Sequence, residues 1–225
     1  MPKPDIYATC PGDGNVLAYY AGTFDSVYVV LSPFIKPISI PIDRFYPATY
    51  PDRQELCTGC EPVSWEVVRE SSGLPSIAAV DVALRTRILG LKAEFANSEY
   101  VDRLELALQK LRIIAPNEGE HSDFLHDKVL ELFQAVGNSW VWVGDEFCSE
   151  RKLHWIDDLK GSEVPVIEGH CNVFAPDKSI LWTVHWDSHF SFLCSNGSTL
   201  ERAIAELKLE GFYCQPQTEV YWSVR

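Results

Sequence analysis

The sequence has little positive charge and no long apolar segment. Lys and Arg contribute 19 residues against 32 Asp and Glu, which gives a formal net charge of -13, and no basic run forms a local exception. Such a chain repels phosphate backbones and anionic lipid surfaces on average. No apolar run approaches the length of a membrane span, and the first residues lack the pattern of a signal peptide. We therefore expect neither nucleic acid nor membrane as partner, and a cytoplasmic location.

The motifs of several large enzyme classes are also missing. The sequence contains no Gly-x-Gly-x-x-Gly after a strand, no P-loop, no His-Glu-x-x-His and no Gly-x-Ser-x-Gly. Nucleotide-binding, zincin and α/β-hydrolase assignments consequently have no support, and no organic cofactor is expected. A Ser or Cys nucleophile stays open, because its partners need to be close only in space.

Seven cysteines occur without a secretion signal, and the odd number favours reduced, partly buried thiols. Cys57 and Cys60 form a Cys-x-x-Cys motif, which could serve a redox function or supply half of a zinc site. However, Glu61 and Pro62 separate the motif from the helix-like segment 64–70, and no second such motif exists. Two ordinary thiols in a loop are the favoured interpretation.

Apolar spacing and turn residues predict a mixed set of elements. Strands are expected at 26–31, 38–42, 140–143, 171–174, 180–186, 190–194 and 220–224, and helices at 77–95, 98–111, 122–136, 149–159 and 198–211. Ser98 is the expected N-cap of the second helix, and Ser198 with Glu201 forms a capping box for the last one.

This order of elements predicts an α+β fold with a helical middle region and a C-terminal antiparallel sheet flanked by helices. At 225 residues, of which 46% are hydrophobic, the chain can form one domain over 1–225. A subdivision into a strand, loop and helical part at 1–137 and a sheet part at 138–225 is the alternative.

The segment 180–194 holds the main candidate site. His185, Asp187 and His189 alternate, so on one unbroken strand they would share a face and could bind a divalent metal ion, with His170 as a fourth ligand. Such a strand would be about twice the usual length, and Asp187 with Ser188 is a good turn pair. A hairpin that reverses at this pair therefore competes with the metal site and is favoured.

Two further groups have an ordinary interpretation beside a functional one. His121, Asp123, His126 and Asp127 are expected to form a solvated helix start, in which Asp123 favours the helix dipole. The seven tryptophans either fill a core or line a recognition surface, and Asp145 and Asp187 are candidate acceptors for indole N–H groups.

Several phrases of the sequence resemble an uncharacterised bacterial family of unknown function. They are Ile-Leu-Trp-Thr-Val-His-Trp-Asp-Ser-His-Phe at 180–190, Glu-Gly-Phe-Tyr-Cys at 210–214, Thr-Glu-Val-Tyr-Trp-Ser-Val at 218–224, Tyr-Tyr-Ala-Gly-Thr-Phe-Asp at 19–25 and Pro-Phe-Ile-Lys-Pro at 33–37. The resemblance covers most of the chain and implies a bacterial, cytoplasmic protein. It implies no catalytic residue and no ligand.

The favoured function is a binding or interaction module for a protein or small ligand, and the acidic charge suggests a basic partner. The alternative is a metal-dependent enzyme, hydrolytic or oxidative, that uses His185, Asp187 and His189. A thiol redox protein that uses Cys57 and Cys60 is a third hypothesis.

Overall fold

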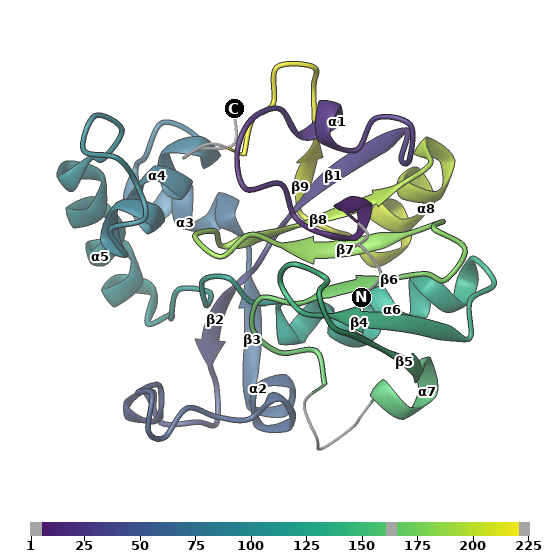
Figure 1. The fold of residues 1–225 in the computed structure, drawn as a ribbon. Coiled ribbons are helices and arrows are strands. Elements are labelled where there is room, and N and C mark those ends of the chain that lie inside the picture. Colours follow the sequence, from purple (N-terminus) through teal and green to yellow (C-terminus); the bar gives the residue numbers. More distant parts are fainter. Residues whose placement is uncertain (1–5, 161–165, 221–225) are drawn as a thin grey trace.

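A computed structural model describes residues 6–160 and 166–220. Its centre is an antiparallel sheet of seven strands in the order β5-β4-β6-β7-β8-β1-β9 (Figure 1). The strands are β1 Ser26–Leu31, β4 Trp140–Gly144, β5 Arg151–Trp155, β6 Asn172–Phe174, β7 Leu181–Val184, β8 Phe190–Ser195 and β9 Gly211–Tyr213. The sheet therefore combines one strand from the first 137 residues with strands from the remainder.

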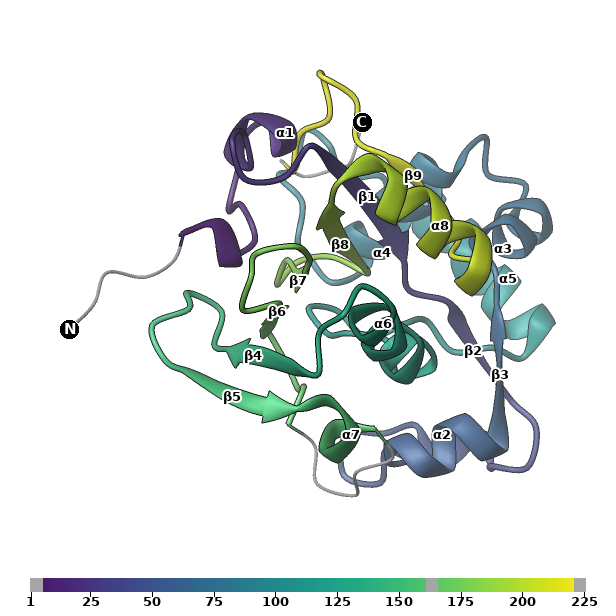
Figure 2. The ribbon, with the colours of Figure 1, turned by 90° about the vertical axis from the view of Figure 1, so that its right-hand side faces the viewer.

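Helices cover both faces of this sheet. The first face carries α1 Val16–Tyr19, α3 Trp65–Ser72, α4 Ile77–Arg87 and α5 Ser98–Leu111, and the second carries α6 Asp123–Ala135, α7 Ile156–Leu159 and α8 Gly197–Leu207. Figure 2 shows α6 and α8 in front of the sheet. In β1, Val27 and Val29 belong to the first core, while Tyr28 and Val30 belong to the second. Both sheet faces are buried, which explains why β1 is an unbroken apolar run.

A smaller unit, which we call the arm, extends from the sheet at the lower part of Figure 1. It consists of β2 Phe34–Pro37 paired with β3 Cys60–Val63, together with the 3-10 helix η2 Ile42–Arg44 and α2 Arg53–Gly59. Asp52 and Glu55 form a reciprocal capping box at the start of α2. Ile35, Leu56 and Cys60 form the small core of the arm. A further 3-10 helix, η1 Ile6–Ala8, lies near the N-terminus.

The structure confirms a mixed α+β fold, with a sheet that lies mostly in the C-terminal half, although the helices are not confined to the middle. The predicted bounds of β1 are correct. The helix expected at 77–95 ends at Arg87, because Leu89 has a positive φ of 62°. The N-cap of α5 is Asn97 rather than Ser98, and its side chain accepts the Tyr100 N–H.

Four further local predictions were wrong. The segment 149–159 forms β5 and the short α7 instead of one helix, because cross-strand pairing with β4 overrides the local helical pattern. Residues 38–42 form no strand, and the strand in this region is β2, which ends at Pro37. Asn196, not Ser198, caps α8 by accepting the Thr199 N–H. Cys57 lies in α2 and Cys60 begins β3, so these thiols are not in a loop.

Residues 221–224 of the expected terminal strand lie outside the described residues. No helix within the described ranges is both long and apolar enough to cross a membrane.

Candidate functional site

The favoured hairpin at 180–194 is present. β7 and β8 pair antiparallel, and a turn closes at Asp187 and Ser188, whose N–H donates to the His185 carbonyl at 3.1 Å. His185 is buried, and its Nδ1 accepts the Asp187 backbone N–H at 3.2 Å. The Asp187 carboxylate accepts the Trp186 indole N–H at 2.7 Å, as expected for an indole acceptor. The turn thus uses His185 and Asp187 structurally.

The two remaining candidate metal ligands, His189 and His170, lie in different surroundings. His189 is buried at 2% exposure and lines the groove described below. His170 is exposed, and its ring packs against Gly119, where an added Cβ would meet Nε2 at 2.3 Å. Within 6–160 and 166–220, no three His, Cys, Asp or Glu side chains are arranged to hold a metal ion. The metal hypothesis gains no support from this geometry and stays a prediction.

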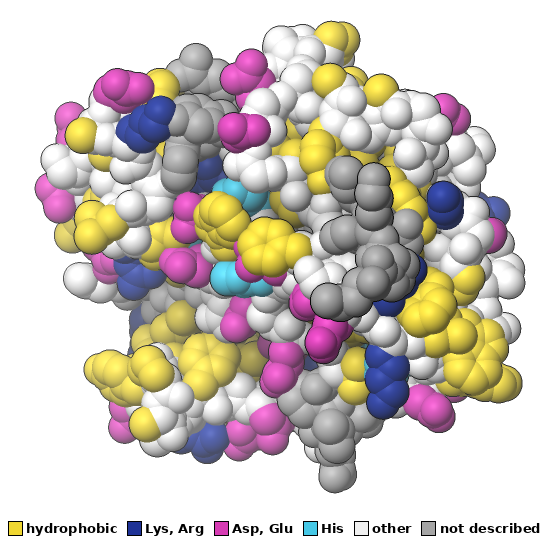
Figure 3. All heavy atoms as spheres, in the orientation of Figure 1, with side chains coloured by type: hydrophobic (Ala, Val, Ile, Leu, Met, Phe, Trp, Pro, Cys, Tyr) yellow, Lys and Arg dark blue, Asp and Glu magenta, His cyan; other side chains and the backbone are white. Residues whose placement is uncertain are grey.

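A large groove lies between the arm and the body of the protein, with a volume of about 1050 Å³. Segments far apart in sequence form its walls, and Figure 3 shows acidic side chains around its mouth at the lower centre. Its lining comes from 45–53 of the arm, 114–126 before and within α6, 166–169, and Arg87, Ile88, Leu159 and His189. A site of this size can hold a small organic molecule.

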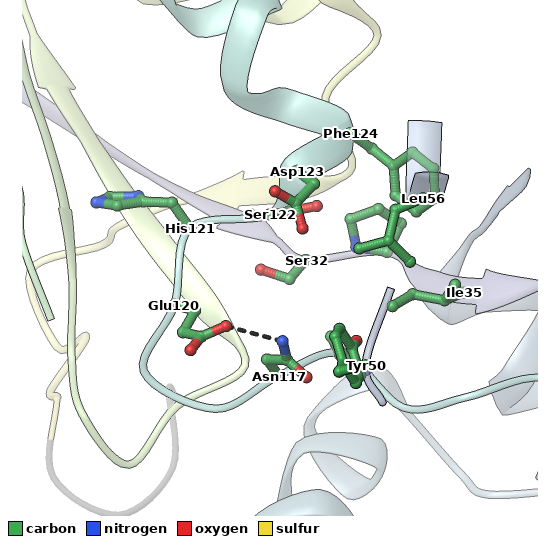
Figure 4. Close-up of a pocket in the computed structure, with 12 residues that line it drawn as sticks. Ser32, Ile35, Tyr50, Leu56, Asn117, Glu120, His121, Ser122, Asp123 and Phe124 are labelled. Carbon is green, nitrogen blue, oxygen red and sulfur yellow. Dashed lines mark hydrogen bonds between the residues drawn. The ribbon is translucent and has the colours of Figure 1, made fainter. Parts of the chain in front are cut away.

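A small hollow adjoins the groove and shares Tyr50, Asn117, Glu120 and Asp123 with it. Its volume of about 20 Å³ has room for one water-sized group. Asp123, Ser32, Tyr50 and Leu56 all line this hollow, and Figure 4 shows the His121 ring pointing away from it. Ser32 is only 2% exposed, and within the described chain its hydroxyl has no hydrogen-bond partner. An unpaired buried hydroxyl costs free energy until a partner binds it.

Asp123 is the chemically unusual residue of the hollow. Burial, together with the charges of Glu120, Glu168 and Asp52, raises the pKa of its carboxyl from 3.8 to about 6, although Arg53 acts in the opposite direction. Arg53 is ion-paired with Asp127, which also binds His126 Nδ1 at 3.0 Å. Within the described residues, no ion pair is formed by Asp123 itself.

Acidic side chains outnumber basic ones in the described lining of the groove. Its lining includes the carboxylates of Asp52, Glu118, Glu120, Asp123 and Glu168, and the guanidinium groups of Arg53 and Arg87. Both guanidinium groups pair with carboxylates outside the lining, since Arg87 Nε lies 2.7 Å from Glu105 Oε1 and Arg53 binds Asp127. Burial lowers the pKa of His121 to about 4, so this side chain is neutral at pH 7. The field inside the groove therefore favours cations.

Replacing Asp123 with Asn is expected to stabilise the protein at pH 7 by about 1–2 kcal/mol. The raised pKa means that the folded state binds a proton more readily than the unfolded state, so the contribution of Asp123 to stability falls as pH rises from 3.8 to about 6. The neutral amide avoids this cost, and the gain should vanish near pH 4. Urea denaturation at both pH values checks this.

Glu99→Gln is the matched control, because Glu99 also lies in a first helical turn, that of α5, but is exposed. This variant should lose a few tenths of a kcal/mol at most. A loss of stability in Asp123→Asn at pH 7 would contradict the argument.

Sequence reasoning missed most of this site. Asp123 and His121 were expected in a solvated helix start, yet α2 of the arm lies against Asp123, His121 packs on the Trp182 ring, and His126 is buried. Ser32, Tyr50 and Asn117 lie in three segments without any motif. The single usable signal was the dense cluster of titratable residues at 118–127.

The fold and groove define an α+β protein with an acidic ligand-sized groove. The chain belongs to the family described as "Protein of unknown function (DUF2711)", whose model matches residues 12–224, so the resemblance to an uncharacterised family is confirmed. It is also similar to "Uncharacterized protein YwbB" of the bacterium Bacillus subtilis (strain 168), with 20% identity over 222 residues that cover 96% of this chain and 98% of that protein. No solved structure matches the chain.

Proposed function

We propose that this protein is a binding module for a small organic amine, whose ammonium group enters the hollow beside Asp123 while the rest of the molecule lies in the groove. The observation that carries the proposal is the half-buried Asp123 carboxylate, which forms no ion pair with any described residue, in the same hollow as the Ser32 hydroxyl, which has no hydrogen-bond partner there either. A primary ammonium group supplies both the charge and the hydrogen-bond donors that these two side chains lack.

The size of the hollow supports an ammonium group over a larger cation. A volume of about 20 Å³ accepts one water-sized group, whereas a planar guanidinium or a quaternary ammonium needs more room. The groove outside supplies apolar and aromatic surface from Phe45, Pro47 and Ile167, together with further carboxylates. Such a lining suits an amine with an apolar chain or a second amine.

Titration with 1,5-diaminopentane should show binding, whereas the uncharged 1,5-pentanediol of similar length should bind much more weakly. Because Asp123 must be ionised to bind the cation, affinity should rise about tenfold between pH 5 and pH 7. Asp123→Asn should weaken binding at pH 7 by about tenfold or more and remove the pH dependence. Calorimetry measures the affinities.

The pKa of Asp123, followed by the NMR shift of its carboxyl carbon, supplies an independent readout. The diamine and methylammonium, whose ammonium group can enter the hollow without a long chain in the groove, should both lower this pKa from about 6. Equal binding of the diol and the diamine, or an unchanged Asp123 pKa at saturating amine, would reject the proposal.

A further inference from the structure

The outermost strand of the sheet, β5, has a backbone edge that no strand in the described part of the chain covers. Its inner edge pairs with β4. Ile156 N–H donates to Ser139 O and Asp145 N–H donates to Glu150 O, both at 3.0 Å. The backbone N–H and C=O groups of the even-numbered residues of β5 therefore point toward β4. The N–H and C=O groups of Arg151, Leu153 and Trp155 consequently point outward. An edge of this kind is a template for pairing with another chain.

The side chains of Leu153 and Trp155 form an exposed apolar stripe together with those of β4 opposite them. Trp155 lies directly opposite Trp140, with ring centroids 5.0 Å apart, and Leu153 lies opposite Trp142. Trp140, Leu153 and Trp155 are 41%, 39% and 42% exposed. Figure 3 shows hydrophobic side chains gathered at the lower right, over β4 and β5. Apolar surface beside an open strand edge indicates an interaction surface.

We propose that β5 pairs antiparallel with β5 of a second copy of this chain, about a twofold axis through Leu153. In this register the outward N–H and C=O groups of Leu153 in the two copies bind each other. Arg151 of each copy lies opposite Trp155 of the other, and the two apolar stripes become continuous. A twofold interface of this kind uses the same surface in both copies.

The charges near β5 favour a second copy of this chain as the partner of the open strand edge. β5 begins with Arg151 and Lys152, and Asp157 and Asp158 follow its end. Antiparallel self-pairing brings Arg151 of one copy diagonal to Asp157 of the other; Glu150 comes near Asp158 of the other copy, so the two basic residues at the start of the strand outnumber the one acidic residue beside them, although the whole chain carries a charge of -13. Arg151 already lies over the Trp142 ring, at 5.6 Å from its centroid, so a guanidinium opposite Trp155 finds an aromatic stripe that binds cations. Lys152 lies opposite His154, so no two like charges of the strands face each other.

Sedimentation velocity of the full chain over a range of concentrations tests this proposal, which does not depend on the proposed ligand. The parent protein should form dimers. Leu153→Pro removes one outward N–H from each copy and should raise the dimer dissociation constant about tenfold or more relative to Leu153→Ala. The alanine variant is the matched control, because it loses the same leucine and keeps the N–H.

Circular dichroism shows whether Leu153→Pro is folded. If Leu153→Pro is unfolded, Trp155→Asp, at an exposed position, replaces it as the test variant. Trp155→Asp puts a carboxylate into the apolar stripe and should likewise abolish the dimer. A parent protein that is monomeric at every concentration would overturn the proposal. A dimer that dissociates equally in the proline and alanine variants, and that Trp155→Asp leaves intact, would overturn it as well.

Discussion

Replacing Asp81 with leucine is expected to lower the free energy of unfolding by about 3–5 kcal/mol. Asp81 and Arg85 lie one turn apart on α4, both are buried, and Arg85 Nε is 3.4 Å from Asp81 Oδ1. The guanidinium also lies 5.3 Å from the centroid of the Phe190 ring, inside the first core. Without the Asp81 carboxylate, the Arg85 guanidinium lies in an apolar interior and has no ion-pair partner among the described residues. The free-energy cost of this unpaired buried charge sets the size of the effect.

A double variant, Asp81→Leu with Arg85→Met, separates the unpaired charge from the lost contacts. Two apolar side chains leave no buried charge, so most of the lost stability should return, to within about 1–2 kcal/mol of the parent. Glu66→Gln, which weakens the exposed Arg69–Glu66 pair, should lower stability far less than Asp81→Leu, because water screens that pair. Chemical denaturation followed by tryptophan fluorescence measures all three. A double variant as unstable as the single one would show that the charge is not the cause.

The second large effect is a loss of stability in acid. Burial lowers the pKa of His121 and His185 to about 4 and that of His189 to about 3, from an ordinary value of 6.5. In the unfolded state these histidines therefore bind protons near pH 6.5, whereas in the folded state they stay neutral until the pH falls to about 4. The contribution of these histidines to stability is full above pH 6.5 and is lost as pH drops through this window, by up to about 3 kcal/mol for each histidine; the single Asp123 carboxyl acts in the opposite direction.

His189→Leu isolates one of these contributions. Its side chain is buried, so leucine removes the titrating group and should flatten the dependence of stability on pH between 6.5 and 4. His170→Gln is the control for replacing a histidine, because His170 is exposed. Denaturation midpoints at several pH values supply the measurement. If His189→Leu kept the slope of the parent, burial of this histidine would not explain the acid sensitivity.

The hairpin of β7 and β8 and the helix α6 could be predicted because their signals are local. Alternating apolar residues with a turn pair specify the first, and apolar spacing after Ser122 specifies the second. The prediction of a helix at 149–159 was wrong because the interaction that decides its structure is not local. Trp155 and Leu153 lie opposite Trp140 and Trp142, and only this pairing with a strand about a dozen residues away selects β5.

The sequence by itself determined the acidic charge, the α+β class, the family resemblance and the elements whose periodicity is strong. Only the tertiary structure decided the candidate site. Ser32 precedes β2, Tyr50 belongs to the arm and Asp123 begins α6, so no local pattern brings these side chains together. The pKa of Asp123 depends on burial beneath the arm, and burial is a property of the assembled chain rather than of any segment.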